Sequence, residues 1–340
     1  MHVTINDVAK KANVSIATVS RVLSKNGSVK TETKDRVERV IKELKYVPNA
    51  AARELNSKRS STIGVVIPSI DNMFFTDVIN GIENQCKTYG YSLFLCVCDY
   101  DPNIEKKQIY ELISRNVAGI IIVDANIENL NSNFYDEIAK QVSLTFINGM
   151  INLNNVSCIS NDEIIGTMTA LNYLTEFGHK EILFVRGAHS HSYDIKEEAF
   201  ILFMRQRGLS YDNRILNIGE GNSLETVNKT KEIVCDILEK DFKISAILAC
   251  NDLMGIGSMK ACKKLNKKIG KDISIIGFDN IELCQMIEPN LTTMDQNMYL
   301  LGSNASMLLQ DIIEHKAYKR IMLENILVER ETVGMKAKSD

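Results

Sequence analysis

Polar side chains follow nearly every apolar segment from residue 62 onward, and their types suit hydrogen bonding to a small polar molecule. Each position alone is ordinary turn chemistry, because Asn and Asp favour turns and helix caps. Their recurrence in both halves of this region predicts a polar ligand-binding cleft. The positions are Asp71-Asn72, Asn148, Asn161-Asp162, the loop Gly187–Asp194, Asn251-Asp252, Asp279-Asn280 and Gln296.

Two groups of residues could bind a metal ion. His189, His191 and Asp194 lie within six residues, so they could ligate a metal, contact a ligand in the cleft, or belong to an ordinary solvated loop. These three alternatives stay open. Cys96 and Cys98 share a face of an expected strand, but no second Cys/His pair lies at zinc-site spacing. We therefore expect the eight cysteines to be reduced and buried, and we expect no bound metal.

No enzyme motif is present. The chain contains neither a Gly-x-x-x-x-Gly-Lys phosphate loop nor a His-Glu-x-x-His metal motif. Gly255 and Gly257 form a weak pair within a helical pattern, without the third glycine of a dinucleotide site. The sequence therefore predicts no catalytic residues and no cofactor.

A second kind of chemistry is indicated near the N-terminus, where two short helical patterns occupy Ile5–Leu23. Thr4 and Asp7 have the spacing of a capping box, and Asn13 tolerates the left-handed turn that would end the first helix. Ser15 can cap the second helix. Two helices joined by so short a turn predict a helix-turn-helix, whose second helix enters the DNA major groove.

The charge distribution agrees with this interpretation. Residues 1–61 contain 13 Lys/Arg and 6 Asp/Glu, a net charge of +7, whereas the whole chain carries −3. The remaining residues therefore carry −10. A basic N-terminal region favours nucleic-acid binding, because contacts to phosphates supply most of the nonspecific affinity.

The 340 residues exceed one ordinary core and predict two or three domains. The composition, 45% apolar and 24% charged, is typical of a soluble protein. No apolar run approaches the ~20 residues that span a bilayer. The N-terminus lacks the apolar core of a signal peptide, so we expect a cytoplasmic protein and no membrane partner.

Alternating strands and helices from residue 62 predict a doubly wound α/β core with two lobes and a cleft at the strand ends. A third helix, 31–46, is followed by a short helical segment, 49–59. A helix of this length is only marginally stable without a packing partner. The expected strands cover 63–68, 91–98, 118–123, 142–148, 181–185, 214–218, 244–249, 273–277 and 321–329. The expected helices cover 74–89, 103–115, 132–140, 162–177, 194–208, 224–239, 252–265 and 298–315.

The head and the core of the chain both resemble a known family. Residues 4–24, which include Asp-Val-Ala and Thr-Val-Ser-Arg-Val-Leu, look like the head of the LacI/GalR transcriptional regulators. Residues 66–75, 250–258, 275–281 and 291–296 resemble the family's effector-binding core. The resemblance implies an all-α helix-turn-helix head, a hinge helix and an α/β two-lobed core similar to periplasmic binding proteins.

The resemblance also implies the function. We expect a ligand-responsive repressor that binds double-stranded, near-palindromic operator DNA as a homodimer, under the control of a small, polar, sugar-like effector. The alternative is a solute-binding receptor without DNA function. The expected boundaries are 1–47 for the head, 48–61 for the hinge, 62–161 plus 291–320 for the N-terminal lobe, and 162–290 plus 321–336 for the C-terminal lobe.

Two sets of site residues follow. Ile16, Ala17 and Arg21 are expected to face base edges, and Leu55 matches a leucine that relatives wedge between base pairs in the minor groove. The candidate DNA-binding residues are Thr4, Ser15, Ile16, Ala17, Thr18, Ser20, Arg21, Asn49, Ala52, Arg53, Leu55 and Asn56. The candidate effector-binding residues are Phe74, Asn148, Asn161, His189, Lys196, Asn251, Asp252, Asp279 and Gln296.

One residue departs from the family pattern. Relatives usually place an arginine four residues before the aromatic that is Phe200 here, and this chain has Lys196. Lysine is a point charge and cannot copy a bidentate guanidinium contact. The carboxylates of Asp252 and Asp279 also disfavour an anion. We therefore expect a polar effector without strong negative charge.

Overall fold

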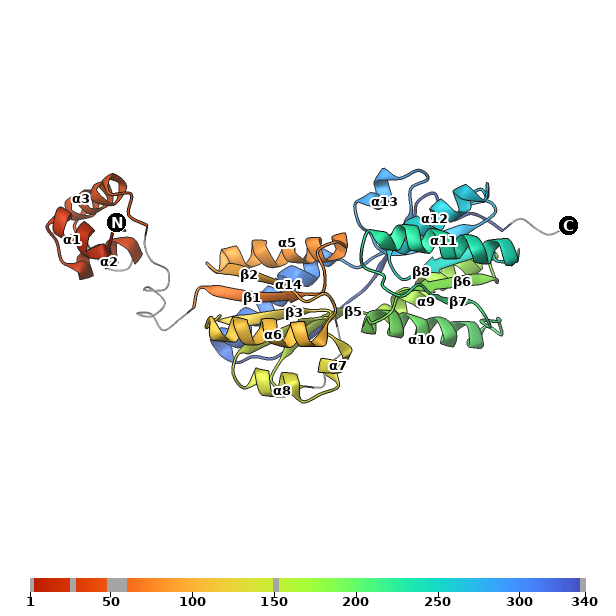
Figure 1. The fold of residues 1–340 in the computed structure, drawn as a ribbon, viewed down its shortest axis with the longest axis horizontal. Coiled ribbons are helices and arrows are strands. Elements are labelled where there is room, and N and C mark those ends of the chain that lie inside the picture. The colour runs from red at the N-terminus through yellow and green to blue at the C-terminus, as the bar shows by residue number, and fades with distance from the viewer. Residues whose placement is uncertain (1–2, 25–28, 48–59, 149–152, 242, 337–340) are drawn as a thin grey trace. The chain divides into compact units, whose positions relative to one another are not determined.

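The structure of the protein is a computed structural model that describes residues 3–24, 29–47, 60–148, 153–241 and 243–336 (Figure 1). The chain divides into two compact units, 1–60 and 61–340. The expected hinge residues Asn49, Ala52, Arg53, Leu55 and Asn56 lie outside the described residues. Within the described ranges, no helix is long and apolar enough to cross a membrane.

The first unit contains helices α1 (Ile5–Ala12), α2 (Ile16–Ser24) and α3 (Thr31–Glu43). Their shared core is formed by Val8, Ala12, Val19 and Val37, none of which is exposed to solvent. Apolar side chains at helical spacing on each element are what bring the three helices together.

The ends of these helices follow from local chemistry. The Thr4 side chain accepts from the Asp7 backbone and Asp7 reaches back to the Thr4 backbone, so the expected capping box is confirmed. Asn13 has φ 50° and ends α1 as expected, and the Thr18 N–H donates to Ser15 Oγ at 3.2 Å. Helix α3 ends at Glu43, earlier than the expected 46, because Lys45 adopts φ 49°.

The second unit contains two six-stranded sheets, which define a first and a second lobe. All adjacent strands are parallel except β10 and β12. The first sheet has the order β11 (Arg320–Leu323), β5 (Ser157–Asn161), β4 (Ser143–Ile147), β3 (Gly119–Val123), β1 (Thr62–Ile67), β2 (Ser92–Val97). The second has the order β12 (Ile326–Val328), β10 (Thr292–Asp295), β9 (Ser274–Asp279), β8 (Ala246–Ala249), β6 (Ile182–Arg186), β7 (Ile215–Asn217).

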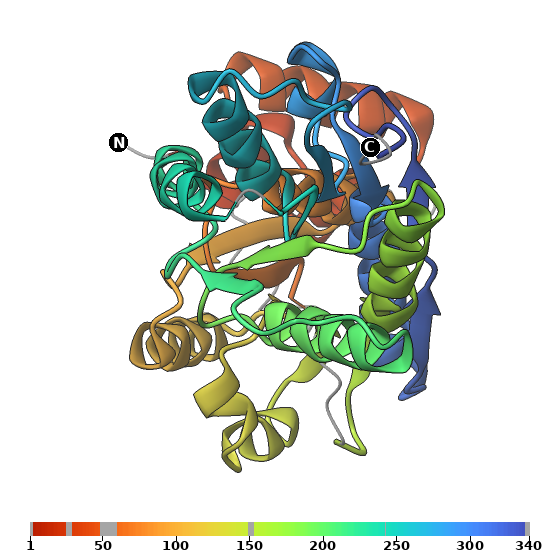
Figure 2. The ribbon, with the colours of Figure 1, turned by 90° about the vertical axis from the view of Figure 1, so that its right-hand side faces the viewer.

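Helices cover both faces of each sheet, as parallel sheets require. In the first lobe, Val65 belongs to the apolar cluster that includes α5 and α14, whereas Val66 belongs to the cluster with α6 and α8. In the second lobe, α9 and α10 pack together, as do α11 and α12 (Figure 2). The first-lobe helices are α5 (Met73–Thr88), α6 (Pro102–Ser114), α7 (Ile127–Leu130), α8 (Phe134–Ala139) and α14 (Met298–His315). The second-lobe helices are α9 (Glu163–Glu176), α10 (His191–Gln206), α11 (Glu225–Lys240), α12 (Asp252–Lys264) and α13 (Leu283–Met286).

The pairing of the last strands differs from the expected lobe boundaries. Thr292–Asp295 joins the second sheet beside β9, although 291–320 was assigned to the first lobe. Arg320–Leu323 joins the first sheet beside β5, although 321–336 was assigned to the second. The single strand expected at 321–329 is two short strands, one in each sheet. Three chain crossings therefore connect the lobes, after β5, β10 and β11.

The short elements were also missed. Strands β5 and β10 and helices α7 and α13 have four or five residues each. Such segments are too short to show a periodic pattern, and their partners lie far away in the sequence.

Candidate DNA-binding and effector-binding sites

Helix α2 presents a solvent-exposed face in the first unit. Ile16 is 49% exposed, and Ala17, Ser20 and Arg21 are exposed beside it, whereas Val19 turns into the core. The side chains of Thr4, Ser15 and Thr18 lie at the starts of the helices. Thr4 caps α1, and Ser15 Oγ, just before α2, lies 2.9 Å from Thr18 Oγ1. A small apolar and cationic surface on a rigid helix has the composition that reads base edges in a major groove.

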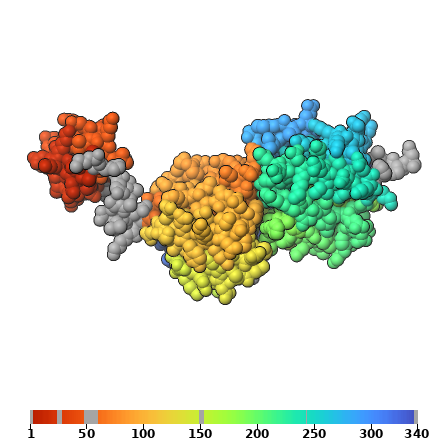
Figure 3. All heavy atoms as spheres, in the orientation of Figure 1, coloured from red at the N-terminus to blue at the C-terminus, as the bar shows by residue number. Residues whose placement is uncertain are grey.

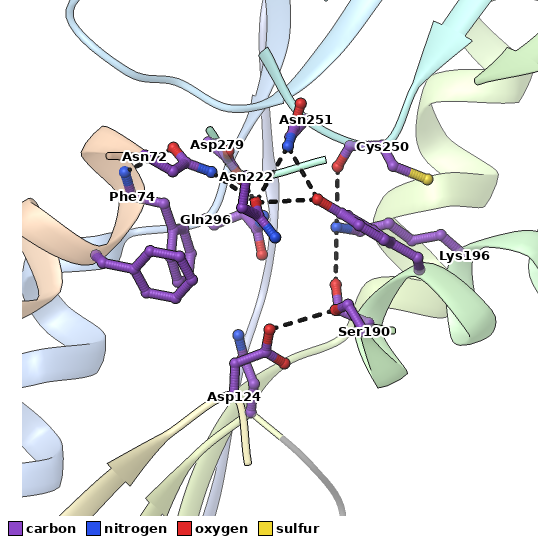
Figure 4. A pocket seen from close by; sticks show the side chains of 14 residues that line it. Asn72, Phe74, Asp124, Ser190, Lys196, Asn222, Cys250, Asn251, Asp279 and Gln296 are labelled. Carbon is purple, nitrogen blue, oxygen red and sulfur yellow. Dashed lines mark hydrogen bonds between the residues drawn. The ribbon is translucent and has the colours of Figure 1, made fainter. Parts of the chain in front are cut away.

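A small pocket lies in the second unit and is lined by residues of both lobes. Figure 3 shows where the two lobes meet, as the change from orange-yellow to green-blue. The volume of the pocket is about 30 Å³, room for about one or two water molecules. Figure 4 shows the side chains that converge on it. The described residues that line it are Asn72, Phe74, Phe75, Asp124, Asn148, Ser190, Ser192, Tyr193, Lys196, Asn222, Cys250, Asn251, Asp279 and Gln296.

Several of the pocket residues lie at strand ends and have left-handed backbone conformations. Asp124, after β3, has φ 49°, Asn148, after β4, has φ 58°, and Asp279, the last residue of β9, has φ 115°. Asn and Asp tolerate positive φ better than most residues do. The residues that adopt these turn conformations therefore also line the pocket.

Hydrogen bonds across the pocket connect the lobes. Asn72 Nδ2, from the first lobe, donates to Asn222 Oδ1, from the second, at 2.9 Å, and Asn222 Nδ2 donates to the Tyr100 hydroxyl of the first lobe. The Tyr193 hydroxyl donates to the same Asn222 Oδ1 at 3.0 Å and accepts from Asn251 Nδ2 at 3.0 Å. Asn222 therefore links both lobes.

Lys196 is buried in the second lobe and has several partners there. Its Nζ lies 3.5 Å from Glu163 Oε1, donates to Ser192 Oγ at 3.1 Å and to the Cys250 carbonyl at 3.3 Å. It also lies 4.5 Å from the centroid of the Phe278 ring. Burial is the largest influence and by itself lowers the pKa of Lys196, but Glu163, Cys250 and Asp279 together outweigh it, so the pKa is raised and the side chain stays protonated.

Three carboxyl groups near the pocket have raised pKa values. Burial, followed by repulsion from Glu163, raises the pKa of Asp124 to about 7. Burial and then the charge of Asp252 raise the pKa of Asp279 well above its usual range. Burial likewise raises the pKa of Asp252 to about 6. These three carboxyl groups are therefore harder to ionise than exposed ones.

The structure brings six candidate effector residues to the pocket: Phe74, Asn148, Lys196, Asn251, Asp279 and Gln296. Three candidates lie elsewhere. Asn161 lines an adjacent pocket and donates to the Gln296 carbonyl at 2.9 Å, and His189 lines a larger groove of about 680 Å³ between the lobes. Asp252 is fully buried behind the pocket, where it accepts from the Ile281 N–H at 2.9 Å.

The segment expected to be a loop at 187–194 is partly helical. Helix α10 begins at His191, so His191 and Asp194 lie in its first turn, and Asp194 pairs with Arg186 at 2.6 Å. Among the residues that the structure describes, no group of three His, Cys, Asp or Glu side chains could hold a metal ion.

Other pocket residues were not selected from the sequence. Asp124 follows an apolar strand just as Asn148 does, so the same rule could have found it. Ser190, Ser192 and Tyr193 lie around the start of α10, in the segment 187–194 that was expected at the cleft, but His189 was the residue of this segment selected as an effector contact. Asn222 belongs to an irregular segment between β7 and α11 and gives no signal in the sequence.

Comparisons with known proteins agree with this architecture. Residues 4–49 match "Bacterial regulatory proteins, lacI family", and residues 171–333 match "Periplasmic binding protein-like domain". The ribose operon repressor of Halalkalibacterium halodurans is 33% identical over 97% of this chain and 96% of that protein. The catabolite control protein A of Priestia megaterium is 33% identical over 91% of this chain and 92% of that protein. The chain therefore belongs to the lacI family of bacterial regulatory proteins.

A solved structure supports the fold independently. The crystal structure of the lac repressor dimer bound to operator and the anti-inducer ONPF superimposes with a TM-score of 0.87. The match covers 98% of this chain and 99% of that chain at 24% identity. The shared fold includes a two-lobed core of the periplasmic-binding-protein kind.

Proposed function

We propose that this protein is a transcriptional repressor that binds operator DNA in a sequence-specific way and responds to a small polar effector in the pocket between the lobes. The exposed face of α2 carries the proposal, because Ile16, Ala17, Ser20 and Arg21 project from a helix that is fixed by capping and by its buried Val19. The repressor names of its relatives point the same way. We expect a cytoplasmic protein without enzymatic activity.

The proposed response to effector is a coupling between ligand binding and lobe arrangement. The pocket is lined from both lobes and is small, so a ligand that fits only a wider pocket shifts the lobes toward another arrangement. A ligand controls the operator affinity only to the extent that it binds the two arrangements with different affinity. Whether the effector induces or co-represses depends on which arrangement suits DNA.

The first test is DNA binding. The full chain is incubated with genomic fragments in a gel-shift assay, and bound fragments are sequenced. A shared near-palindromic sequence supports the proposal. A chain that binds no fragment selectively favours the alternative, a solute-binding receptor without DNA function.

The second test is assembly. A homodimer is expected, because a single helix-turn-helix offers little contact surface and a two-fold dimer matches a near-palindromic site. The lac repressor structure is described as a dimer bound to operator. Light scattering at micromolar concentration should give twice the chain mass of 38.2 kDa. A monomer both with and without operator DNA contradicts this part of the proposal.

A further inference from the structure

We propose that the effector carries a protonated amine among its hydrogen-bonding groups, and that this cation occupies the interlobe pocket between Asp124 of the first lobe and Asp279 of the second. This inference rests on the proposed effector function of the pocket. It narrows the ligand class from any small polar molecule to a cationic one, such as an amino sugar or a polyhydroxylated amine.

The one described cation that lines the pocket is already engaged. Lys196 forms an ion pair with Glu163 at 3.5 Å, and its other donors meet Ser192 Oγ and the Cys250 carbonyl. Both members of the pair belong to the second lobe and are buried, with side chains 2% and 6% exposed. Because its charge is balanced within the protein, Lys196 is poorly placed to bind an anionic ligand.

Two residues that line the same pocket have unused acceptor oxygens. Asp279 is 3% exposed, and its Oδ1 accepts from Gln296 Nε2 at 2.6 Å. Its buried Oδ2 has no partner at hydrogen-bond geometry among the described residues, although the Asn72 side chain lies near enough to lower the pKa of Asp279 slightly against the effect of burial. Asn148 is 7% exposed, and its buried Oδ1 likewise lacks a partner within the described part of the chain. A buried acceptor without a donor is costly, so these oxygens favour a ligand that supplies N–H or O–H groups.

The charges around the pocket favour an amine ligand over a neutral alcohol. Asp124 accepts one hydrogen bond, from Ser190 Oγ at 3.3 Å, and four carboxyl groups cluster here around a single ammonium: Asp124, Glu163, Asp252 and Asp279. Burial first, and then the neighbouring carboxyl groups, raise the pKa values of Asp124 and Asp279, and an ammonium ion beside them favours their ionised forms. A hydroxyl group donates one hydrogen bond without charge, whereas an ammonium donates three and also compensates the carboxylates.

Asp124 and Asp279 belong to different lobes. Figure 4 shows Asp124 on the opposite side of the pocket from Asp279, each on its own lobe. An ammonium ion between them can donate to both and favours the ionised form of each carboxyl group. The ligand therefore contacts both lobes through charge, which is the requirement for changing their relative arrangement.

The test uses the full chain and matched ligand pairs that differ by one amine. D-glucosamine is compared with D-glucose, D-galactosamine with D-galactose, and 1-amino-1-deoxy-D-sorbitol with D-sorbitol, with D-gluconate as the anion. Thermal shift identifies ligands, because a ligand that binds the native state raises the melting temperature. Titration calorimetry then gives Kd. At least one amine should bind at least tenfold more tightly than its neutral partner, and gluconate should not bind.

Two isosteric variants locate the cation. Asp124→Asn and Asp279→Asn keep the side-chain shape, and asparagine tolerates the positive φ at both positions. Each should reduce the preference for the amine over the alcohol at least tenfold. Glu314→Gln, on the exposed surface of α14, removes one negative charge far from the pocket residues and should preserve the preference.

Several outcomes overturn the inference. They are equal binding of an amine and its neutral partner, binding of gluconate, no binding by any amine in the panel, or an amine preference that survives both Asp variants. Operator binding by the same preparation is measured in parallel by gel shift. If the chain binds operator DNA but its effector is neutral, this inference is wrong and the proposed function still holds. If the chain does not bind operator DNA, the proposed function is itself contradicted.

Discussion

Arg21 is the residue on α2 with the greatest capacity to discriminate between bases. Its guanidinium can donate two parallel hydrogen bonds to guanine, and such a pair contributes about 1–3 kcal/mol of discrimination. Arg21→Ala should therefore relax sequence preference at one position of each half-site. Binding-site selection with the purified variant measures this, and Arg115→Ala, an exposed arginine of the second unit, is the control. An unchanged selected sequence contradicts the assignment.

Asp124 should make the stability of the protein depend on pH. Its pKa is about 7 in the folded protein against a usual value of 3.8, because it is buried near Glu163 and, more weakly, Glu105, while Ser190 and Lys196 oppose the shift. Between these values the folded state holds a proton that the unfolded state releases. This contribution to stability is therefore complete below about pH 4 and is lost as the pH rises toward 7.

The variant Asp124→Asn removes that titration and tests its sign. The melting temperature of the variant, relative to the parent, should increase between pH 5 and pH 8. Asp252 and Asp279 also have raised pKa values, but they remain in both proteins and cancel in the difference. A difference in melting temperature that is constant across this range contradicts the prediction.

At the scale of elements, helices α5 and α14 approach each other unusually closely through two glycines. A Cβ atom added at Gly81 would lie 2.1 Å from the Tyr299 carbonyl oxygen, and one at Gly302 would lie 2.0 Å from the Val78 carbonyl oxygen. The obstacles are backbone atoms, so they cannot rotate away. The contact between these helices therefore depends on the absence of side chains at both positions.

Gly302→Ala should destabilise the second unit, because the cost of forcing the helices apart exceeds the ~1 kcal/mol that alanine gains over glycine in a helix. The reason is that the helices must separate, and overpacking typically costs about 1–3 kcal/mol. Urea unfolding monitored by circular dichroism measures the change in free energy. Met307→Ala, at an exposed position of the same helix, should change stability by less than about 0.5 kcal/mol. Equal stability of both variants and the parent rules out this account of the contact.

At the scale of the whole second unit, Asn72 and Asn222 hold the lobes together across the pocket. Asn72 has two separate contacts: its Oδ1 accepts from the Phe74 N–H at 3.1 Å and caps α5, and its Nδ2 donates to Asn222 at 2.9 Å. Asn72→Asp keeps the capping oxygen but places a carboxylate against Asn222 Oδ1. This substitution therefore separates helix capping from lobe contact.

We expect Asn72→Asp to open the pocket. Backbone amides near Asn222 and Tyr193 should exchange hydrogen faster in the variant, while amides in the middle of α5 keep the protection of the parent. Hydrogen exchange followed by mass spectrometry gives both readouts. Asn131→Asp, an exposed position with the same change of charge, is the control. Unchanged exchange around the pocket would show that these bonds do not hold the lobes.

The sequence by itself determined the features that depend on local chemistry. The capping box of Thr4 and Asp7, the left-handed Asn13 and the cap at Ser15 involve residues at most three apart, so their geometry follows from residue type. The alternation of apolar strands and helices likewise predicted the α/β core. Polar residues after successive strands led to most of the pocket, because parallel strands end at one edge of a sheet.

Only the tertiary structure decided what depends on distant partners. Thr292–Asp295 and Arg320–Leu323 exchanged their expected lobes, because the choice of a sheet depends on pairing with β9 or β5 and not on the strand's own residues. Lys196 lines the pocket, but only the assembled structure shows that Glu163 on a neighbouring helix balances its charge. Asn222 reaches the pocket from a segment without periodicity. Burial, charge balance and pairing are properties of the assembled chain, so no single stretch of sequence contains them.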